Sequence, residues 1–269
     1  MSEELLSSRK LNVSLILAVI NEKENISILL GKLNLLIDQF GDIIKELIVV
    51  DGGSTDGSIE YIREYANIKN KYKTILIEIG KKTGTVHSQL TGVKVASSDY
   101  VIVMDADLQH PPDLIPVFLN MLEKNTDLII ASRYLGGGEC IRAPYRGVIS
   151  RGAALLSKVL IPEAHKLTDP MSGYFLVKRD ILLKVDQTNH LYKLALNIIS
   201  FNPDIKVKEI PYTFKEREMG VSKVVNIRMN FIFLFFKELI IYSRINRKLR
   251  RNPNGVADSG YNHEVNLNE

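Results

Sequence analysis

Two carboxylates close an apolar run near the middle of the chain. Asp105 directly follows the apolar residues 100–104, and Asp107 and Gln109 come at every second position after it. If the run is a strand, side chains at i and i+2 project from the same face, so both carboxylates reach one point. Carboxylate and amide oxygens suit Mg²⁺ or Mn²⁺, particularly when a diphosphate supplies the remaining ligands. The spacing therefore indicates a divalent-metal site, and the alternative is a solvated turn.

A second polar cluster occupies residues 49–58, Val-Val-Asp-Gly-Gly-Ser-Thr-Asp-Gly-Ser. Gly52 and Gly53 can take positive φ and Asp56 can cap a helix, so the segment predicts a tight turn whatever its function. Asp51 could bond a nucleotide's base or ribose in the same crevice. The chain has neither the glycine fingerprint of dinucleotide-binding folds nor a phosphate loop ending in Gly-Lys-Ser/Thr, which disfavours hydride transfer and ATP hydrolysis.

Apolar, β-branched runs typical of buried strands alternate with segments whose apolar residues recur every three to four positions. This alternation predicts an α/β fold with a mostly parallel, doubly wound sheet, in which ligands bind outside the carboxyl ends of the strands. The polar clusters follow the first, second and fourth strands, so we expect them to face one crevice. The expected strands are 13–19, 46–50, 74–79, 100–104 and 127–131, and the expected helices are 26–40, 57–66, 87–96 and 112–124.

The composition is that of an ordinary globular protein. The chain has 269 residues, 45% of them apolar and 25% charged, which predicts one domain of catalytic size plus an appendage. A net charge of +4 is too small to indicate nucleic-acid binding. Cys140 is the single cysteine and fits a reducing compartment. Residues 1–12 are acidic and polar, unlike a secretory signal, and we expect a loose lead-in.

The composition changes near the C-terminus. Residues 224–251 are apolar and then basic, but Arg228, Lys237 and Glu238 interrupt the apolar part, so a membrane-spanning helix is not expected. The pattern predicts an amphipathic helix that lies on a membrane, and the alternative is a helix packed on the domain's own core. Residues 252–269 have too few apolar side chains to fold alone and are predicted to be a disordered tail. The basic residues expected to meet anionic headgroups are Arg244, Arg247, Lys248, Arg250 and Arg251.

Five segments, in this order, resemble the polyprenyl-phosphate glycosyltransferases of glycosyltransferase family 2, most nearly the dolichol-phosphate mannose synthases. The resemblance covers about residues 11–225 and implies a catalytic domain at 13–223 with a GT-A nucleotide-sugar-binding fold. It also implies a divalent ion and transfer of one sugar, with inversion, to a lipid phosphate. The segments are 105–115, 131–138, 146–160, 169–182 and 214–223.

The resemblance assigns roles to matching positions. On the donor side it implies that the metal and nucleotide diphosphate are held by Asp105, Asp107, Gln109, Glu22 and Asp51. It implies that the donor diphosphate is closed over by Arg217, Ser222 and Lys223, and that the acceptor phosphate is held by Arg133, Arg146 and Ser150. Guanidinium groups can grip phosphate oxygens bidentately, which agrees with the arginine positions.

No general base is assigned, because a phosphate monoester is largely deprotonated at neutral pH. His110 and Asp169 could be proposed for that role. We expect instead that His110 caps or packs at the start of a helix, and that Asp169 bonds turn backbone or orients an arginine.

The chain departs from the family pattern where the nucleotide base is expected. Residues 18–22 read Ala-Val-Ile-Asn-Glu where the family commonly has Pro-x-Tyr-Asn-Glu, and Gly52 replaces the second acid of an Asp-Asp pair. Residues 84–86 read Gly-Thr-Val in place of Gly-Leu-Gly. These changes concern the choice of base and sugar more than the reaction.

The resulting prediction is a peripheral enzyme at the cytoplasmic face of a membrane, which moves mannose from GDP-mannose to dolichyl or polyprenyl phosphate with Mg²⁺ or Mn²⁺, alone or with a small membrane partner subunit. One alternative uses UDP-glucose as the donor. Another transfers sugar to a hydroxyl of a polysaccharide or glycolipid, which would need a general base and would leave the acceptor arginines without a phosphate. A third is a non-catalytic scaffold subunit with the same fold.

Overall fold

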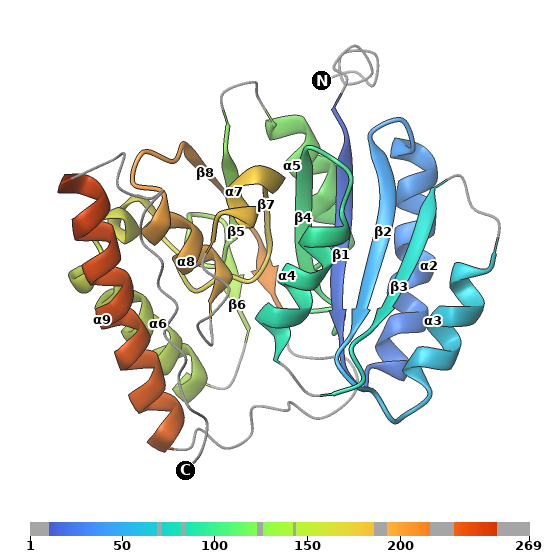
Figure 1. Ribbon diagram of the computed structural model, residues 1–269, viewed down its shortest axis with the longest axis horizontal. Helices are drawn as coiled ribbons and strands as arrows, with labels where there is room; N and C mark the ends of the chain where they lie inside the picture. The colour runs from blue at the N-terminus through green and yellow to red at the C-terminus, as the bar shows by residue number, and fades with distance from the viewer. Residues whose placement is uncertain are drawn as a thin grey trace.

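The computed structural model describes residues 11–68, 72–81, 84–122, 126–141, 144–185, 193–215 and 229–251. Its centre is a seven-stranded sheet with the strand order β3-β2-β1-β4-β7-β5-β8 (Figure 1). The strands of this sheet are β1 (Val13–Val19), β2 (Ile44–Asp51), β3 (Lys73–Glu78), β4 (Tyr100–Asp105), β5 (Leu128–Ser132), β7 (Phe175–Lys178) and β8 (Val207–Pro211). A small second sheet pairs β6 (Glu139–Cys140) with β9 (Thr213–Phe214).

The sheet is mostly parallel, as expected. β1 pairs in parallel with β2 and β4, β2 pairs in parallel with β3, and β5 pairs in parallel with β8. β7 is the exception, because it runs antiparallel to both β4 and β5. Since two reversals cancel, β5 runs in the same direction as β4. The carboxyl ends of β1, β2, β4 and β5 therefore lie at one edge of the sheet.

Alternation along the strands fills a core on each face of the sheet. Leu15 and Leu17 of β1 enter one core and Ile16 enters the other. The first core is covered by α2 (Lys23–Phe40), α3 (Ser58–Ala66), the 3₁₀ turn η1 (Pro112–Leu114) and α5 (Ile115–Met121). The second is covered by α4 (Thr85–Val95), α6 (Pro144–Leu160), η2 (Pro162–Lys166), α7 (Arg179–Leu183), α8 (Leu194–Phe201) and α9 (Met229–Arg251).

The sequence located the first nine elements within a few residues, with one difference. The single helix expected at 112–124 is a 3₁₀ turn followed by α5, which ends at Met121. Pro116 lacks the amide hydrogen that a continuous helix would use to bond the Pro112 carbonyl, which favours a short, segmented start.

The C-terminal helix α9 packs on the domain. Leu239 and Tyr242 are buried in the second core, and the Asn246 side-chain amide donates to the Ser200 carbonyl of α8 at 3.1 Å. The Asn197 amide of α8 also donates to the Tyr242 hydroxyl at 3.2 Å. One face of α9 thus belongs to the core, which agrees with the alternative that this helix packs on its own domain. Among the described residues, no helix is both long and apolar enough to cross a membrane.

Leu239→Ala should lower the free energy of unfolding by about 2–5 kcal/mol, because it removes a fully buried side chain between α9 and the domain. Urea unfolding measures the change. Ile240→Ala, at a neighbouring position of the same helix that is 46% exposed, is the matched control and should change stability by about 0.5 kcal/mol or less. Equal effects of the two variants would contradict the packing of α9.

Candidate active site at the carboxyl edge of the sheet

The polar clusters meet at one edge of the sheet, as expected from the order of the strands. In the strand register Asp51 of β2 lies opposite Val19, and Asp105 of β4 lies opposite Ala18, so the two acids flank the end of β1. Arg133 and Tyr134 follow β5 at the same edge. In Figure 1 the arrowheads of β1, β2 and β3 mark this edge at the bottom of the view.

Hydrogen bonds join the loop after β1 to the loop after β2. The Asn21 amide donates to Ser54 Oγ at 2.8 Å, and Asn21 Oδ1 accepts from the Thr55 amide at 2.7 Å. The Glu22 amide donates to Ser58 Oγ at 3.0 Å. Asn21 has a φ of +49°, a left-handed conformation that asparagine tolerates better than most residues. The two loops therefore form one hydrogen-bonded wall at this edge of the sheet.

Asp56 completes that wall. Its carboxylate accepts from the Lys23 amide and from both the amide and the hydroxyl of Ser58. Partial burial opposes ionisation, but these hydrogen bonds outweigh it and lower the pKa of Asp56. Asp56, which was predicted to cap a helix, thus accepts from Ser58 at the start of α3, and its carboxylate is held in the ionised form.

Asp51 and Glu22 are largely occupied by their neighbours. Asp51 is fully buried; its Oδ1 accepts from the Gly53 and Ser54 amides, each at 2.8 Å, and its Oδ2 accepts from the Ser54 hydroxyl. Glu22 is 7% exposed and accepts from the Asn25 side-chain amide at 2.7 Å. Both acids therefore shape the turn, and a direct contact with a nucleotide stays a prediction.

The turn after β4 presents its two carboxylates differently. The Asp105 side chain is 38% exposed, whereas Asp107 is 6% exposed and accepts from the Gln109 amide at 3.1 Å. Leu108, between Asp107 and Gln109, has a φ of +63°, an uncommon conformation for a residue other than glycine, which tightens the turn. Gln109 donates from Nε2 to the Lys215 carbonyl at 2.7 Å, so its amide ties this turn to the end of β9.

This turn fits a divalent ion that shares its ligands with a substrate. Within the part of the chain that the structure describes, no three His, Cys, Asp or Glu side chains gather as a metal cluster. The predicted protein ligands are the two carboxylates of Asp105 and Asp107 and the amide oxygen of Gln109. Mg²⁺ and its like are commonly bound by one or two carboxylates plus substrate phosphates, which is what this partial ligand set suits.

A buried ion pair follows β5. Arg133 donates to Asp169 from Nε at 2.6 Å and from Nη2 at 2.8 Å, and its backbone amide donates to the same carboxylate at 3.2 Å. Burial opposes the charge of Arg133, but the bond to Asp169 outweighs it and raises the pKa of the guanidinium. Asp169 therefore orients an arginine, as expected. The bidentate phosphate grip expected of Arg133 is limited, because two of its nitrogens already bond Asp169.

The segment that carries Asp169 is itself fixed from β8. The Glu209 carboxylate accepts from the Thr168 amide at 2.8 Å, from the Thr168 hydroxyl at 3.0 Å and from the Asp169 amide at 3.1 Å. The Thr168 hydroxyl also lies 2.5 Å from the Ser132 hydroxyl at the end of β5. The backbone on either side of the Arg133–Asp169 pair is thus fixed by hydrogen bonds to Glu209 and between Ser132 and Thr168.

Two residues that the sequence did not indicate as functional, Tyr134 and Arg151, lie near Ser150 of α6. The Tyr134 hydroxyl donates to Ser150 Oγ at 3.1 Å, and the Arg151 guanidinium lies 5.4 Å from the centre of the Tyr134 ring. Arg146 is one helical turn before Ser150, with its side chain outside the described residues. In the sequence, the one indication that Tyr134 and Arg151 belong to the site is that each directly follows a predicted site residue, Arg133 or Ser150.

Tyr212 is buried beside the turn after β4, where its ring centre lies 6.2 Å from that of His110. Burial foremost raises the pKa of its hydroxyl; nearby Arg133 opposes this rise, and the carboxylates of Asp169 and Asp105 add to it. Arg217, Ser222 and Lys223 lie outside the described residues, and their roles stay predictions.

Three comparisons bear on the family. The model of the family described as "Glycosyl transferase family 2" matches residues 14–185. A dolichol-phosphate mannosyltransferase of Pyrococcus furiosus is 33% identical over 215 residues, which are 80% of this chain and 59% of that protein. A polyprenol monophosphomannose synthase of Mycolicibacterium smegmatis is 29% identical over 78% of this chain and 79% of its own length. The chain thus spans about three fifths of the first of these relatives.

The fold resembles that of a solved enzyme. Glucosyl-3-phosphoglycerate synthase of Mycobacterium tuberculosis, crystallised with Mn²⁺ and UDP-glucose, matches with a TM-score of 0.65 over 91% of this chain and 83% of that one. At 17% identity this likeness concerns the fold alone. It confirms the expected GT-A-like α/β architecture.

Asp169→Asn should destabilise the protein by about 3–5 kcal/mol, because it leaves the buried Arg133 charge without its partner. Glu78→Gln is the matched control, since the Glu78–Arg63 pair is 41% and 54% exposed and should contribute about 1 kcal/mol or less. Denaturant unfolding compares the two. Similar small losses would contradict the structural role given to the Arg133–Asp169 pair.

Proposed function

The chain belongs to glycosyltransferase family 2, and from this premise we propose that it transfers a hexose from a nucleotide-diphosphate sugar to a polyprenyl or dolichyl phosphate. Mannose, carried by GDP-mannose, is the first choice because both curated relatives described above are named for mannose transfer. The observation that carries the proposal is that Asp51, Asp105 and the Arg133–Asp169 pair come at the ends of β2, β4 and β5, at one edge of the sheet.

The donor half of the reaction uses the turn after β4. We assign Mg²⁺ or Mn²⁺ to Asp105, Asp107 and the amide oxygen of Gln109; when bound, the ion neutralises charge on the leaving diphosphate. The solved Mycobacterium tuberculosis enzyme, crystallised with Mn²⁺ and UDP-glucose, supports a metal in this fold. The loops that join Asn21 to Ser54 and Thr55 form the wall against which the nucleoside lies. Arg217, Ser222 and Lys223 are assigned to the donor diphosphate.

The acceptor half uses the group around Tyr134. The Ser150 hydroxyl and the Arg151 guanidinium converge on the Tyr134 ring, and Arg146 precedes Ser150 by one turn. An incoming phosphate monoester can bond these donors. Because it is already largely ionised near neutral pH, its oxygen can attack the sugar's anomeric carbon directly as the diphosphate leaves, with inversion and without a general base.

In this arrangement Arg133 acts mainly through position. Its guanidinium is held by Asp169 and lies 5.2 Å from the Tyr134 ring centre and 5.6 Å from that of Phe214. The fixed positive charge therefore stands beside the proposed acceptor group. It favours an anion there even if only Nη1 reaches the phosphate.

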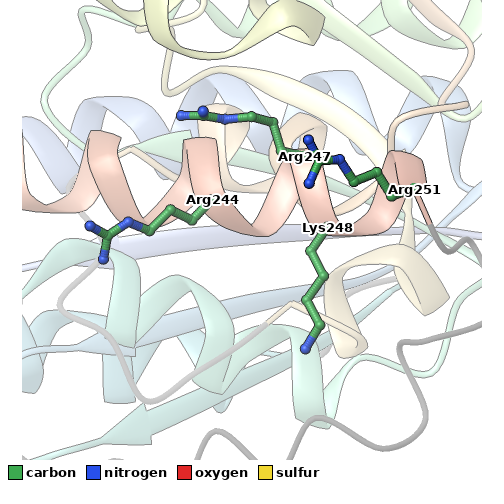
Figure 2. Close-up of a pocket in the computed structure, with 4 residues that line it drawn as sticks. All are labelled: Arg244, Arg247, Lys248 and Arg251. Atoms are coloured by element: carbon green, nitrogen blue, oxygen red, sulfur yellow. The ribbon is translucent and has the colours of Figure 1, made fainter.

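A lipid acceptor requires the enzyme to reach a membrane, and α6 and α9 support peripheral binding. Val148, Leu155 and Val159 recur along one side of α6 and are 65–70% exposed, an unusual state for such side chains. They share the helix with Ser150. Near the C-terminus, Figure 2 shows four basic side chains projecting from α9, and these residues line an open hollow. They are Arg244, Arg247, Lys248 and Arg251.

We therefore assign the protein to the cytoplasmic face of a membrane, whose anionic lipids attract basic helices. The apolar side of α6 enters the headgroup region, while the outer side of α9 supplies positive charge. A small membrane partner subunit could cover the same apolar side. This assignment differs from a membrane role for α9 alone, because one face of that helix is buried against α8.

UDP-glucose is the second candidate donor. Gly52 stands where the family commonly has an acid. A Cβ at this position would lie 3.5 Å from the Val19 carbonyl oxygen and 3.6 Å from Ser88 Oγ, which are ordinary van der Waals distances, so the space around position 52 does not require glycine. The altered position lies beside the wall assigned to the nucleoside. The resemblance in fold to an enzyme crystallised with UDP-glucose also favours this candidate.

The function is tested by transfer of labelled sugar into organic-extractable lipid, with purified protein, polyprenyl phosphate and Mn²⁺, from GDP-mannose and UDP-glucose in parallel. Mannose transfer supports the first candidate and glucose transfer the second. Asp107→Ala should lower transfer at least about 100-fold, because it removes a ligand of the ion that stabilises the leaving group. Normal activity of this variant would contradict the metal assignment, and failure of the wild type to bind either donor would favour a scaffold.

Membrane binding is tested by sedimentation with vesicles containing phosphatidylserine. The double variant Leu155→Asp and Val159→Asp should lose most binding, because each exposed side chain contributes roughly 1.5–3 kcal/mol when it enters an apolar environment. Leu35→Asp, at a position of α2 that is 74% exposed, is the control and should bind like the wild type. Unchanged binding of the double variant would contradict the role given to α6.

A further inference from the structure

His110 is buried directly behind the carboxylate that we assign to the metal. It is 2% exposed, and its Nδ1 accepts a hydrogen bond from the Asp105 backbone amide at 2.9 Å. Its ring stacks on Tyr174 at a centroid distance of 4.9 Å and an interplanar angle of 20°. Tyr212 and Phe214 meet it at 6.2 and 6.1 Å with their rings turned edgewise. The imidazole is therefore held on several sides.

The Asp105 amide needs this side chain because the neighbouring strand has ended. β7 pairs with β4 from Tyr100 opposite Lys178 to Val103 opposite Phe175. Two residues further along, the same register would bring Asp105 opposite Gly173, which precedes β7. A Cβ on Gly173 would lie 3.5 Å from His110 Cε1 and 3.8 Å from Asp105 Oδ2. The ring thus lies where the strand pairing stops and supplies a hydrogen-bond acceptor there.

The hydrogen bond also sets the state of the ring. An imidazole nitrogen that accepts from an amide carries no proton, so the proton of neutral His110 is on Nε2. Tyr174 reinforces the arrangement, because its hydroxyl donates to the Pro111 carbonyl at 3.0 Å while its ring stacks on His110. The two ends of the segment 105–111 are thus each fixed by a hydrogen bond, one from the Asp105 amide and one to the Pro111 carbonyl.

We propose that His110 is a positioning residue that fixes the backbone of Asp105 and so orients this carboxylate toward the divalent ion. The inference rests on the proposed function, because it takes Asp105 as a metal ligand. Groups that hydrogen-bond to a metal ligand commonly change metal affinity about 10- to 100-fold when they are removed, and His110 bonds the backbone of the proposed ligand. His110 thus acts through Asp105 and needs no contact with the substrate.

A packing role for the ring makes the opposite prediction, and two substitutions separate them. His110→Phe keeps an aromatic ring against Tyr174 but removes the acceptor. His110→Asn loses the ring but keeps an acceptor atom bonded to Cγ, as Nδ1 is. Positioning through the hydrogen bond requires Asn to preserve metal binding better than Phe. Packing alone requires Phe to preserve it better than Asn.

The measurement is the Mn²⁺ concentration that gives half-maximal binding of GDP, and in a parallel series of UDP, with thermal unfolding to verify that each variant is folded. We expect His110→Phe to raise this concentration at least about tenfold and His110→Asn to stay within about threefold of the wild type. Should His110→Phe not fold, His110→Asn is compared with His110→Gln, which also lacks the ring but places its acceptor one bond further from Cγ.

Each outcome decides between the claims. A wild type whose nucleotide binding needs Mn²⁺, with His110→Phe equal to it or better than His110→Asn, overturns the positioning role and leaves the proposed function intact. A wild type that binds neither nucleotide in a Mn²⁺-dependent manner overturns the metal assignment and the inference together.

Discussion

Backbone amides at the carboxyl edge of the sheet need other hydrogen-bond acceptors once the strand pairing stops, and side chains of the candidate site supply several of them. Asp51 accepts from the Gly53 and Ser54 amides, His110 from the Asp105 amide, and Asp169 from the Arg133 amide. The same polar side chains that make the edge suitable for a charged ligand therefore hold its loops in shape. Structure and candidate function are coupled at this edge, because few of these residues can change without exposing a donor.

Charge is distributed along the edge in a graded manner. Arg133 and Asp169 are buried and paired, so they provide fixed dipoles and a stable base, supported by Glu209. Asp105 is partly exposed. On α6, the Arg151 guanidinium lies near the Tyr134 ring and Ser150 accepts from the Tyr134 hydroxyl. A metal–diphosphate on one side and a lipid phosphate on the other would each find the opposite charge that it requires.

Much of this architecture was predictable from local patterns. The β-branched runs located β1 to β5, and the Asp-x-Asp spacing at a strand end selected the turn after β4, to which we assign the metal. The antiparallel insertion of β7 was not predictable, because its short apolar run carries no signal of direction. The sequence predicted that Asp169 orients an arginine but not that the arginine is Arg133, because the two residues are 36 apart in sequence. For α9, the hydrophobic pattern indicated burial of an apolar face but not whether protein or lipid covers it, and the structure places α8 against part of it.

The central claim is that a sugar is joined to a lipid phosphate, and ³¹P NMR tests it most directly. The account predicts that, with protein, Mn²⁺ and a nucleotide-diphosphate sugar, the monoester signal of polyprenyl phosphate is replaced by a phosphodiester signal while free nucleoside diphosphate accumulates in equal amount. Release of nucleoside diphosphate with the monoester signal unchanged would contradict the account, because the sugar would then have gone to water or to another acceptor.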